Sequence, residues 1–248
     1  MGEAPAGLKD LTLRVLVINP NSSPKNTQVI ADAVAPYLRR DLQVDCVNPE
    51  KGPVGLESYY HNCLASVEVY KIVRDAEARG YDGVVIAAFG DPGVEGAKEI
   101  ASIPVVGVAE ASYALARLLG VKFLVIVSAD TAVPRQVSYI KRLGIPDHMY
   151  AVRPIGLTIV DVMKDRIGVK ELVVKCCEAA LNETGSELVV MGCSGFSGFR
   201  SEIEKQLGVP VIDPVVAGIH VCEALARMGL AQSKVLTYRK PPEFEIRS

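Results

Sequence analysis

The stretch VVMGCSG, residues 189–195, decides how this sequence folds, because a similar stretch, VVIAAFG, occurs at residues 84–90. Each begins as an apolar run and ends in a turn of mostly small residues. Each is followed by a segment of helical character and then by a short apolar run that starts with proline, at residues 104–106 and 210–212. A unit of strand, turn, helix and strand that occurs twice predicts two similar lobes that face each other.

Further apolar runs follow the same plan, among them VLVI at residues 15–18 and FLVIV at residues 123–127. Strands that are apolar throughout, rather than alternating, are typical of a parallel sheet covered on both faces. Their alternation with helical segments predicts a doubly wound α/β layout. In such sheets ligands bind beyond the carboxyl ends of the strands, so the residues that follow each run are the candidates for a site.

The composition of the chain limits the classes of function that it can have. The chain has 248 residues, of which 49% are hydrophobic, enough for a core without disulfides. A net charge of −2 without a block of Lys or Arg argues against a nucleic-acid partner. No apolar run approaches the ~18 residues of a membrane span, and the N-terminal stretch lacks a signal-peptide layout. Six cysteines without zinc spacing predict free thiols and a cytoplasmic protein, with no metal site.

Cys193 is the first candidate for chemistry. It ends a predicted strand and begins the turn GCSGFSG, with Ser194 and Gly195 next to it. Backbone N–H groups in such a turn can bind an anion, and the same field would lower the pKa of the thiol and suit it to acid–base chemistry. A cysteine that merely packs in the core is the alternative. The repeat favours a functional role, because it pairs Cys193 with Ala88 at a second strand end.

Polar residues end two other predicted strands. Asn21, in NPNSS, can donate hydrogen bonds to a ligand carbonyl, whereas Ser22 or Ser23 is expected to cap the helix that starts near Pro24. Ser128 is the polar tip of the strand at 123–127. Asp91, in a Gly–Asp–Pro–Gly turn, is predicted to bond N–H groups of that turn, a structural role. Neither a dinucleotide fingerprint nor a P-loop is present, so no cofactor is predicted.

Five segments, VLVINPNSS, AAFGDPG, PVVGVAEA, MGCSGF and GVPVIDPV, occur in this order and resemble the aspartate/glutamate/hydantoin racemase superfamily, most closely its hydantoin and allantoin racemase branch. The resemblance covers nearly the whole chain. It implies two pseudo-symmetric α/β lobes, each a mainly parallel sheet flanked by helices, with the active site in the cleft between them. The implied lobes are residues 14–115 with 214–248, and residues 116–213, after an extension at 1–13. A cofactor-independent, even-numbered homo-oligomer that acts on a small molecule is also implied.

Members of this branch use two cysteines, one per lobe, on opposite faces of the substrate's stereocentre. One thiolate removes the Cα proton and the other thiol donates a proton from the far side. The resemblance places the second cysteine at Cys193 and the first, in the motif Ala-Cys-Phe-Gly-Asp-Pro-Gly, at Ala88. Alanine cannot exchange protons, so either the cysteine has been removed from this form or the chain works with one thiol. Cys63 lies outside the motif and is a poor substitute.

The resemblance therefore predicts a racemase that inverts C5 of 5-monosubstituted hydantoins by two-base proton transfer, inactive or one-sided in this form. Allantoin is the second candidate substrate. Two different functions stay open beside the racemase, a single-cysteine decarboxylase of the arylmalonate type and a non-catalytic small-molecule binding protein, although FGDPG favours the hydantoin branch. The expected substrate-binding residues are Pro20, Asn21, Phe89, Gly90, Ser128, Ala129, Ser194 and Gly195.

Overall fold

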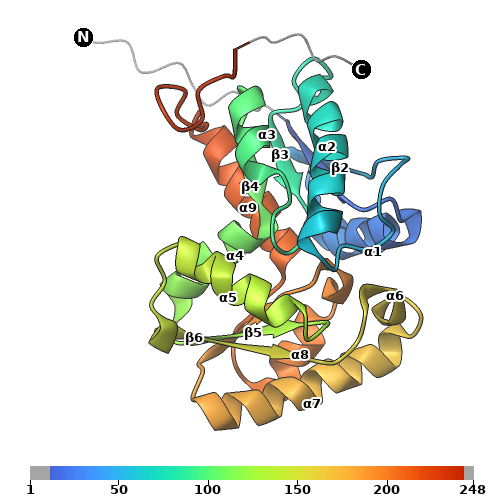
Figure 1. The fold of residues 1–248 in the computed structure, drawn as a ribbon, viewed down its shortest axis with the longest axis vertical. Helices are drawn as coiled ribbons and strands as arrows, with labels where there is room; N and C mark the ends of the chain where they lie inside the picture. Colours follow the sequence, from blue (N-terminus) through green and yellow to red (C-terminus); the bar gives the residue numbers. More distant parts are fainter. Residues whose placement is uncertain (1–11, 243–248) are drawn as a thin grey trace.

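A computed structural model describes residues 12–242, which form two four-stranded parallel sheets flanked by helices (Figure 1). The strand order is β2-β1-β3-β4 in the first sheet and β6-β5-β7-β8 in the second, so both sheets follow one topology. The strands are β1 Leu13–Ile18, β2 Leu42–Val47, β3 Gly83–Ile86, β4 Val105–Gly107, β5 Phe123–Val127, β6 Tyr150–Pro154, β7 Leu188–Met191 and β8 Val211–Ile212. The predicted α/β fold is confirmed.

The repeat in the sequence occupies equivalent places in the two sheets. VVIAAFG supplies β3 and the turn after it, and VVMGCSG supplies β7 and the turn after it, each strand being third in its sheet. The register pairs Ile18 with Ile86 in the first sheet and Ile126 with Met191 in the second. The central strands of each sheet therefore end level with each other, and their carboxyl ends present the following loops at one edge.

Two edge strands, β2 and β6, are not unbroken apolar runs, so the sequence pattern does not predict them. The strand β2 reads LQVDCV, in which buried or half-buried residues alternate with exposed ones over its first half. The strand β6 ends in two half-buried residues. Both strands lie at an edge and are incompletely covered, so they carry polar residues, whereas the short edge strands β4 and β8 are buried throughout and stay apolar.

The helices pack against the sheets and connect successive strands. They are α1 Pro24–Val34, α2 Tyr59–Ala76, α3 Val94–Ile100, α4 Val108–Leu119, α5 Ala132–Arg142, α6 Ile159–Val162, α7 Arg166–Thr184, α8 Arg200–Leu207 and α9 Pro214–Arg227, with short 3-10 turns at Ala35–Tyr37, Asp147–Met149 and Ser194–Phe196. Ser23 caps α1 by accepting the N–H of Asn26, and Pro24 opens the helix, as predicted. No helix within residues 12–242 is long and apolar enough to cross a membrane.

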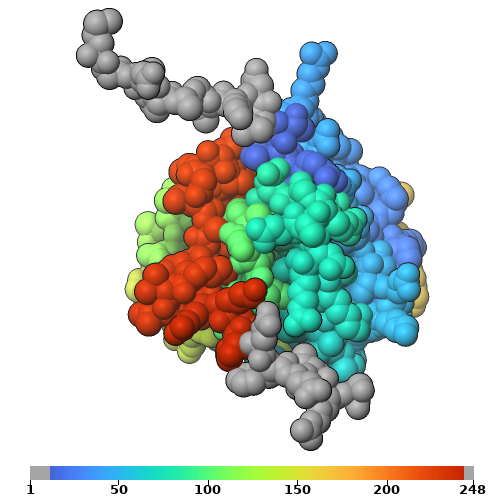
Figure 2. Space-filling model, turned by 90° about the horizontal axis from the view of Figure 1, so that it is seen from above, coloured from blue at the N-terminus to red at the C-terminus, as the bar shows by residue number. Residues whose placement is uncertain are grey.

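The last helix, α9, returns to the first sheet. Its residues Val215, Ile219 and Cys222 share one core cluster with Val17 and Val85 of β1 and β3. Seen from above, the C-terminal segment in red lies beside the green and teal segments of the first half of the chain (Figure 2). This packing of α9 supports the proposed N-terminal lobe, 14–115 with 214–248, of which residues 243–248 lie outside the described residues.

Helix α4 lies where the two halves meet. It contacts α9 and β4 and also β7 and β8. Its residues Ala109, Tyr113 and Ala116 are buried in a cluster with Phe123 of β5 and Leu188 of β7. The helix runs to Leu119, beyond residue 115 at which the sequence divides the lobes. Of the predicted extension 1–13, residues 1–11 lie outside the described residues, and Leu13 already belongs to β1.

Candidate active site

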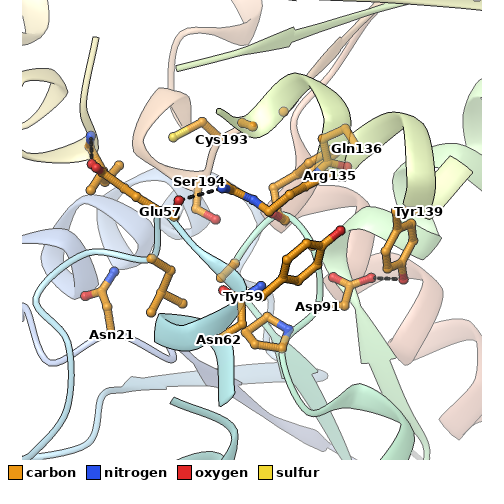
Figure 3. A pocket seen from close by; sticks show the side chains of 18 of the residues that line it. Asn21, Glu57, Tyr59, Asn62, Asp91, Arg135, Gln136, Tyr139, Cys193 and Ser194 are labelled. Atoms are coloured by element: carbon orange, nitrogen blue, oxygen red, sulfur yellow. Dashed lines mark hydrogen bonds between the residues drawn. The ribbon is translucent and has the colours of Figure 1, made fainter. Parts of the chain in front are cut away.

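A cavity of about 250 Å³ lies at the carboxyl ends of the central strands of both sheets (Figure 3). Its volume is near the lower end of small-ligand sites and suits a small metabolite. Residues that directly follow the strands β1, β3, β5 and β7 line it: Asn21, Ala87, Ala88, Phe89, Gly90, Ser128, Ala129, Gly192, Cys193, Ser194 and Gly195. Both sheets thus contribute the ends of their strands to one site.

A hydrogen bond joins the two repeated strand ends. The hydroxyl of Ser194, just after β7, donates to the main-chain oxygen of Ala87, just after β3, at 2.7 Å. The residues next to these two in the chain, Cys193 and Ala88, line the same cavity. The pair that the repeat aligns is therefore brought together from different sheets.

Cys193 is buried, with 8% of its surface exposed. Burial raises the pKa of its thiol above the usual value, because a thiolate loses solvation there. The N–H of Gly195, the hydroxyl of Ser128, the charge of Arg166 and the N–H of Phe196 act in the opposite direction and do not overcome burial. The turn does act to lower this pKa, as predicted, but the net change is upward, because desolvation depends on tertiary packing that the local turn does not reveal.

Arg166 holds the turn that follows Cys193. It donates one hydrogen bond to the main-chain oxygen of Gly195 and another to that of Ser197, the second at 2.8 Å. Its guanidinium also stacks over the ring of Phe199, 4.4 Å from the ring centroid. These contacts fix the main chain around Cys193, so the N–H groups that face the sulfur keep their positions.

Asn21 presents one end of its amide to the cavity. Its Oδ1 accepts the Nδ2–H of Asn19 at 2.9 Å and the main-chain N–H of Ser23 at 3.0 Å. Its own Nδ2 makes no hydrogen bond within residues 12–242, although only 4% of the residue is exposed. This arrangement leaves an N–H donor for a ligand carbonyl. Pro20, by contrast, is not among the residues that line the cavity.

Asp91 lies in the cavity wall and is itself buried. Its carboxylate accepts the main-chain N–H groups of Ala109 and Glu110, at 2.8 and 2.9 Å, and the hydroxyl of Tyr139 at 2.6 Å. The predicted bonds to its own turn are thus replaced by bonds to the start of α4, and the role remains structural. Burial raises the pKa of Asp91 to about 7. Gly107 faces the carboxylate so closely that a Cβ there would lie 2.2 Å from its Cγ.

Several residues that follow no strand end also line the cavity, and one of them is Cys63, which its place outside the motif makes a poor substitute for the first cysteine. The loop before α2 and the start of that helix supply Glu57, Tyr59, Asn62 and Cys63, α1 supplies Asn26, and α5 supplies Arg135, Gln136, Tyr139 and Arg142. They follow no strand end, so nothing in the local pattern marks them. No group of three or more His, Cys, Asp or Glu side chains in the described part of the chain is placed to hold a metal ion.

Comparison with known proteins identifies the family. A family model described as Asp/Glu/Hydantoin racemase matches residues 15–222. The chain belongs to this family. It is 35% identical to a hydantoin racemase from Pseudomonas sp., over 94% of each chain, and 33% identical to a hydantoin racemase from Paenarthrobacter aurescens, over 93% of this chain and 98% of the relative. The resemblance seen in the sequence is confirmed.

Solved structures agree with this assignment. An allantoin racemase from Klebsiella pneumoniae superposes with a TM-score of 0.91 at 30% identity, covering 95% of this chain and 96% of that one. A liganded mutant of arylmalonate decarboxylase superposes with a TM-score of 0.70 at 18% identity, covering 87% and 93%, and shares the fold. The relatives named racemases are isomerases, and this chain is assigned to the same enzyme class.

Proposed function

We propose that the chain binds 5-monosubstituted hydantoins, allantoin among them, in this cavity, and that Cys193 moves the C5 proton on one face of the ring. The observation that carries the proposal is the placement of Cys193 and Ala88 in one cavity, at equivalent strand ends of two sheets, with Ser194 bonded to Ala87 between them. The identity with hydantoin racemases and the structural similarity to an allantoin racemase support the substrate class.

The chemistry fits the groups present. A hydantoin loses its C5 proton to give an enolate, whose charge passes to the neighbouring ring carbonyl. The free Nδ2–H donor of Asn21 and the N–H groups of the turn after Cys193 are suited to a carbonyl oxygen that gains negative charge. The Cys193 thiolate is the base that takes the proton, and the resulting thiol is the acid that returns it. These steps need no cofactor.

Ala88 makes the proposed reaction one-sided. Inversion at C5 requires a proton from the face opposite to the one that lost it, and a methyl group has none to give. In this form the enzyme removes and returns a proton on the Cys193 face and racemises slowly. The two-base mechanism belongs to a form with a cysteine at position 88.

A cytoplasmic location and an even-numbered homo-oligomer are further parts of the proposal.

Deuterium exchange tests this function. Each enantiomer of 5-methylhydantoin is incubated with the protein in D₂O, and the H5 signal and the optical rotation are followed together. One enantiomer is expected to lose its H5 signal while the rotation stays constant, once the captured proton has exchanged with solvent. Equal exchange of both enantiomers, or loss of rotation as fast as exchange, would contradict proton transfer by Cys193 alone and would point to a second group, such as the thiol of Cys63 in the cavity wall.

Parallel incubations with other compounds separate the remaining candidate functions. Release of CO₂ from an arylmalonate would favour the decarboxylase, which needs one cysteine only. Binding of a hydantoin without exchange would favour a binding protein. Allantoin, which is a hydantoin with a ureido group at C5, is tested in parallel because of the structural similarity to an allantoin racemase. A faster exchange of allantoin than of 5-methylhydantoin would make it the preferred substrate.

The rate of enzymatic exchange is expected to rise with pH. Burial raises the pKa of Cys193 above its ordinary value near 9.0, so the thiol is mostly protonated at neutral pH. Below its pKa the thiolate fraction grows about tenfold per pH unit, and kcat/KM for exchange should grow in proportion between pH 6 and 8. Exchange is measured by NMR in buffered D₂O, with Cys193→Ala subtracting solvent-catalysed exchange. A profile that is flat over this range would show that the thiol ionises at lower pH.

A further inference from the structure

Five charged side chains line the cavity, and each of them contacts another group of the protein. Glu57 accepts the main-chain N–H of Ile159 at 2.8 Å. Asp91 accepts the three hydrogen bonds described above. Glu95 and Arg142 form an ion pair at 3.5 Å. The fifth, on Arg135, has no acidic partner among the described residues.

Arg135 reaches from α5 toward the loop that carries Glu57 (Figure 3). Its Nη1 donates to the main-chain oxygen of Glu57 at 2.5 Å, a neutral acceptor. The carboxylate of Glu57 is engaged with the N–H of Ile159 instead. The Arg135 side chain is half-buried, and this burial lowers the pKa of its guanidinium. A partly desolvated cation therefore lines the cavity without an ion pair within residues 12–242, and the charge of Glu57 only partly offsets the effect of burial on the pKa of Arg135.

The hydrogen bonds of Arg135 leave one edge of its guanidinium group free. Nε and Nη2 make no hydrogen bond within residues 12–242, whereas Nη1 is occupied. Two parallel N–H groups on one edge of a guanidinium match the two oxygens of a carboxylate. A carboxylate on a ligand would supply both acceptors for this edge and place a negative charge directly against it.

We propose that Arg135 binds the C5 substituent of the substrate and that the preferred substrates are hydantoins whose substituent ends in a carboxylate. This inference rests on the proposed function. Cys193 and Arg135 line the same cavity from a strand end and from α5, so a ring with its C5 at Cys193 has its substituent free to extend toward α5. An uncharged acceptor, such as a ureido group, binds the same edge more weakly because it lacks the charge.

A matched pair of ligands tests the inference. Dissociation constants of 5-(2-carboxyethyl)hydantoin and of the nearly isosteric 5-(2-carbamoylethyl)hydantoin are measured by calorimetry at low ionic strength. We expect the carboxylate to bind the unaltered protein at least about tenfold more tightly, with a smaller ratio in high salt. Equal affinities, or a preference for the amide, would overturn the inference without any variant.

Variants then assign the preference to Arg135. Arg135→Met should reduce the ratio of the two dissociation constants to about one, and Arg135→Lys should retain part of it. Lys141→Met removes a positive charge from the same helix outside the cavity and serves as the matched control, which should keep the full ratio. A ratio that survives in Arg135→Met, or that disappears equally in Lys141→Met, would contradict the assignment.

Deuterium exchange of 5-methylhydantoin by the unaltered protein shows whether a negative result concerns the role of Arg135 alone or the proposed function as a whole. This ligand has no terminal group for Arg135 to bind. If it exchanges while the carboxylate preference is absent, the role of Arg135 is overturned and the proposed function stands. If no hydantoin exchanges, the proposed function is overturned, whatever the affinities show.

Discussion

Replacing Ala88 with cysteine is expected to raise the rate of hydantoin racemisation by about two to four orders of magnitude, the usual contribution of a positioned acid or base. The substitution adds a thiol at the end of β3, in the wall of the cavity that Cys193 also lines. Ala88 is only partly buried and borders open space, so the added sulfur has room without displacing the core. With a thiol at a strand end of each sheet, we expect that the enolate formed on one face can be protonated on the other.

The gain is measured by following optical rotation of each 5-methylhydantoin enantiomer in H₂O. Ala88→Ser is the matched control, because serine is close in size to cysteine but its hydroxyl is a far weaker acid. Serine should give little gain. If Ala88→Cys folds and binds the ligand but racemises no faster than the unaltered protein, the two-thiol account of this family's site does not apply to this cavity.

The repeat explains why so much of the fold could be predicted. A strand, its turn and the next strand recur at 84–106 and 189–212, and each copy occupies the same place in its sheet. Central parallel strands are apolar because both faces are covered, and this leaves a clear signal in the sequence. The edge strands β2 and β6 lack that signal because they are less completely covered, whereas the short edge strands β4 and β8 are buried throughout and stay apolar.

The residues of the site fall into two groups, those that follow strands and can be predicted, and those that reach the cavity from elsewhere and cannot. Asn21, Ser128 and Cys193 directly follow strands, and the carboxyl ends of parallel strands meet at one edge, so the sequence indicates that they lie together. Arg135 and Glu57 reach the cavity from a helix and a loop whose placement depends on how the two halves pack. No local pattern encodes that packing.

Electrostatic properties are the least predictable from the sequence. The turn after Cys193 does supply N–H groups, as its sequence indicates, yet burial raises the pKa of the thiol. Asp91 likewise sits in a tight turn, but its carboxylate caps α4, which begins at Val108. In both cases residues distant in the sequence decide the environment of the charged form.

Removing the Cys193 thiol is expected to have the second large effect. Cys193→Ala should reduce exchange of the C5 proton by at least about a hundredfold, because no other thiol in the site occupies that strand end. The loss is measured by the H5 signal in D₂O, with ligand affinity and thermal unfolding followed in parallel. Cys222→Ala, a buried cysteine that packs against β3 outside the cavity, is the matched control. If Cys193→Ala retains exchange, another group is the base.

The most direct measurement moves the thiol of position 193 to position 88, from a strand end of the second sheet to a strand end of the first. The double variant Ala88→Cys/Cys193→Ala keeps one cysteine at the paired positions but places it on the opposite side of the ring. We predict that this variant exchanges the C5 proton of the enantiomer that the unaltered protein leaves untouched, again with constant rotation. Exchange of the same enantiomer by both proteins would show that residues 88 and 193 do not lie on opposite faces of C5 of the hydantoin.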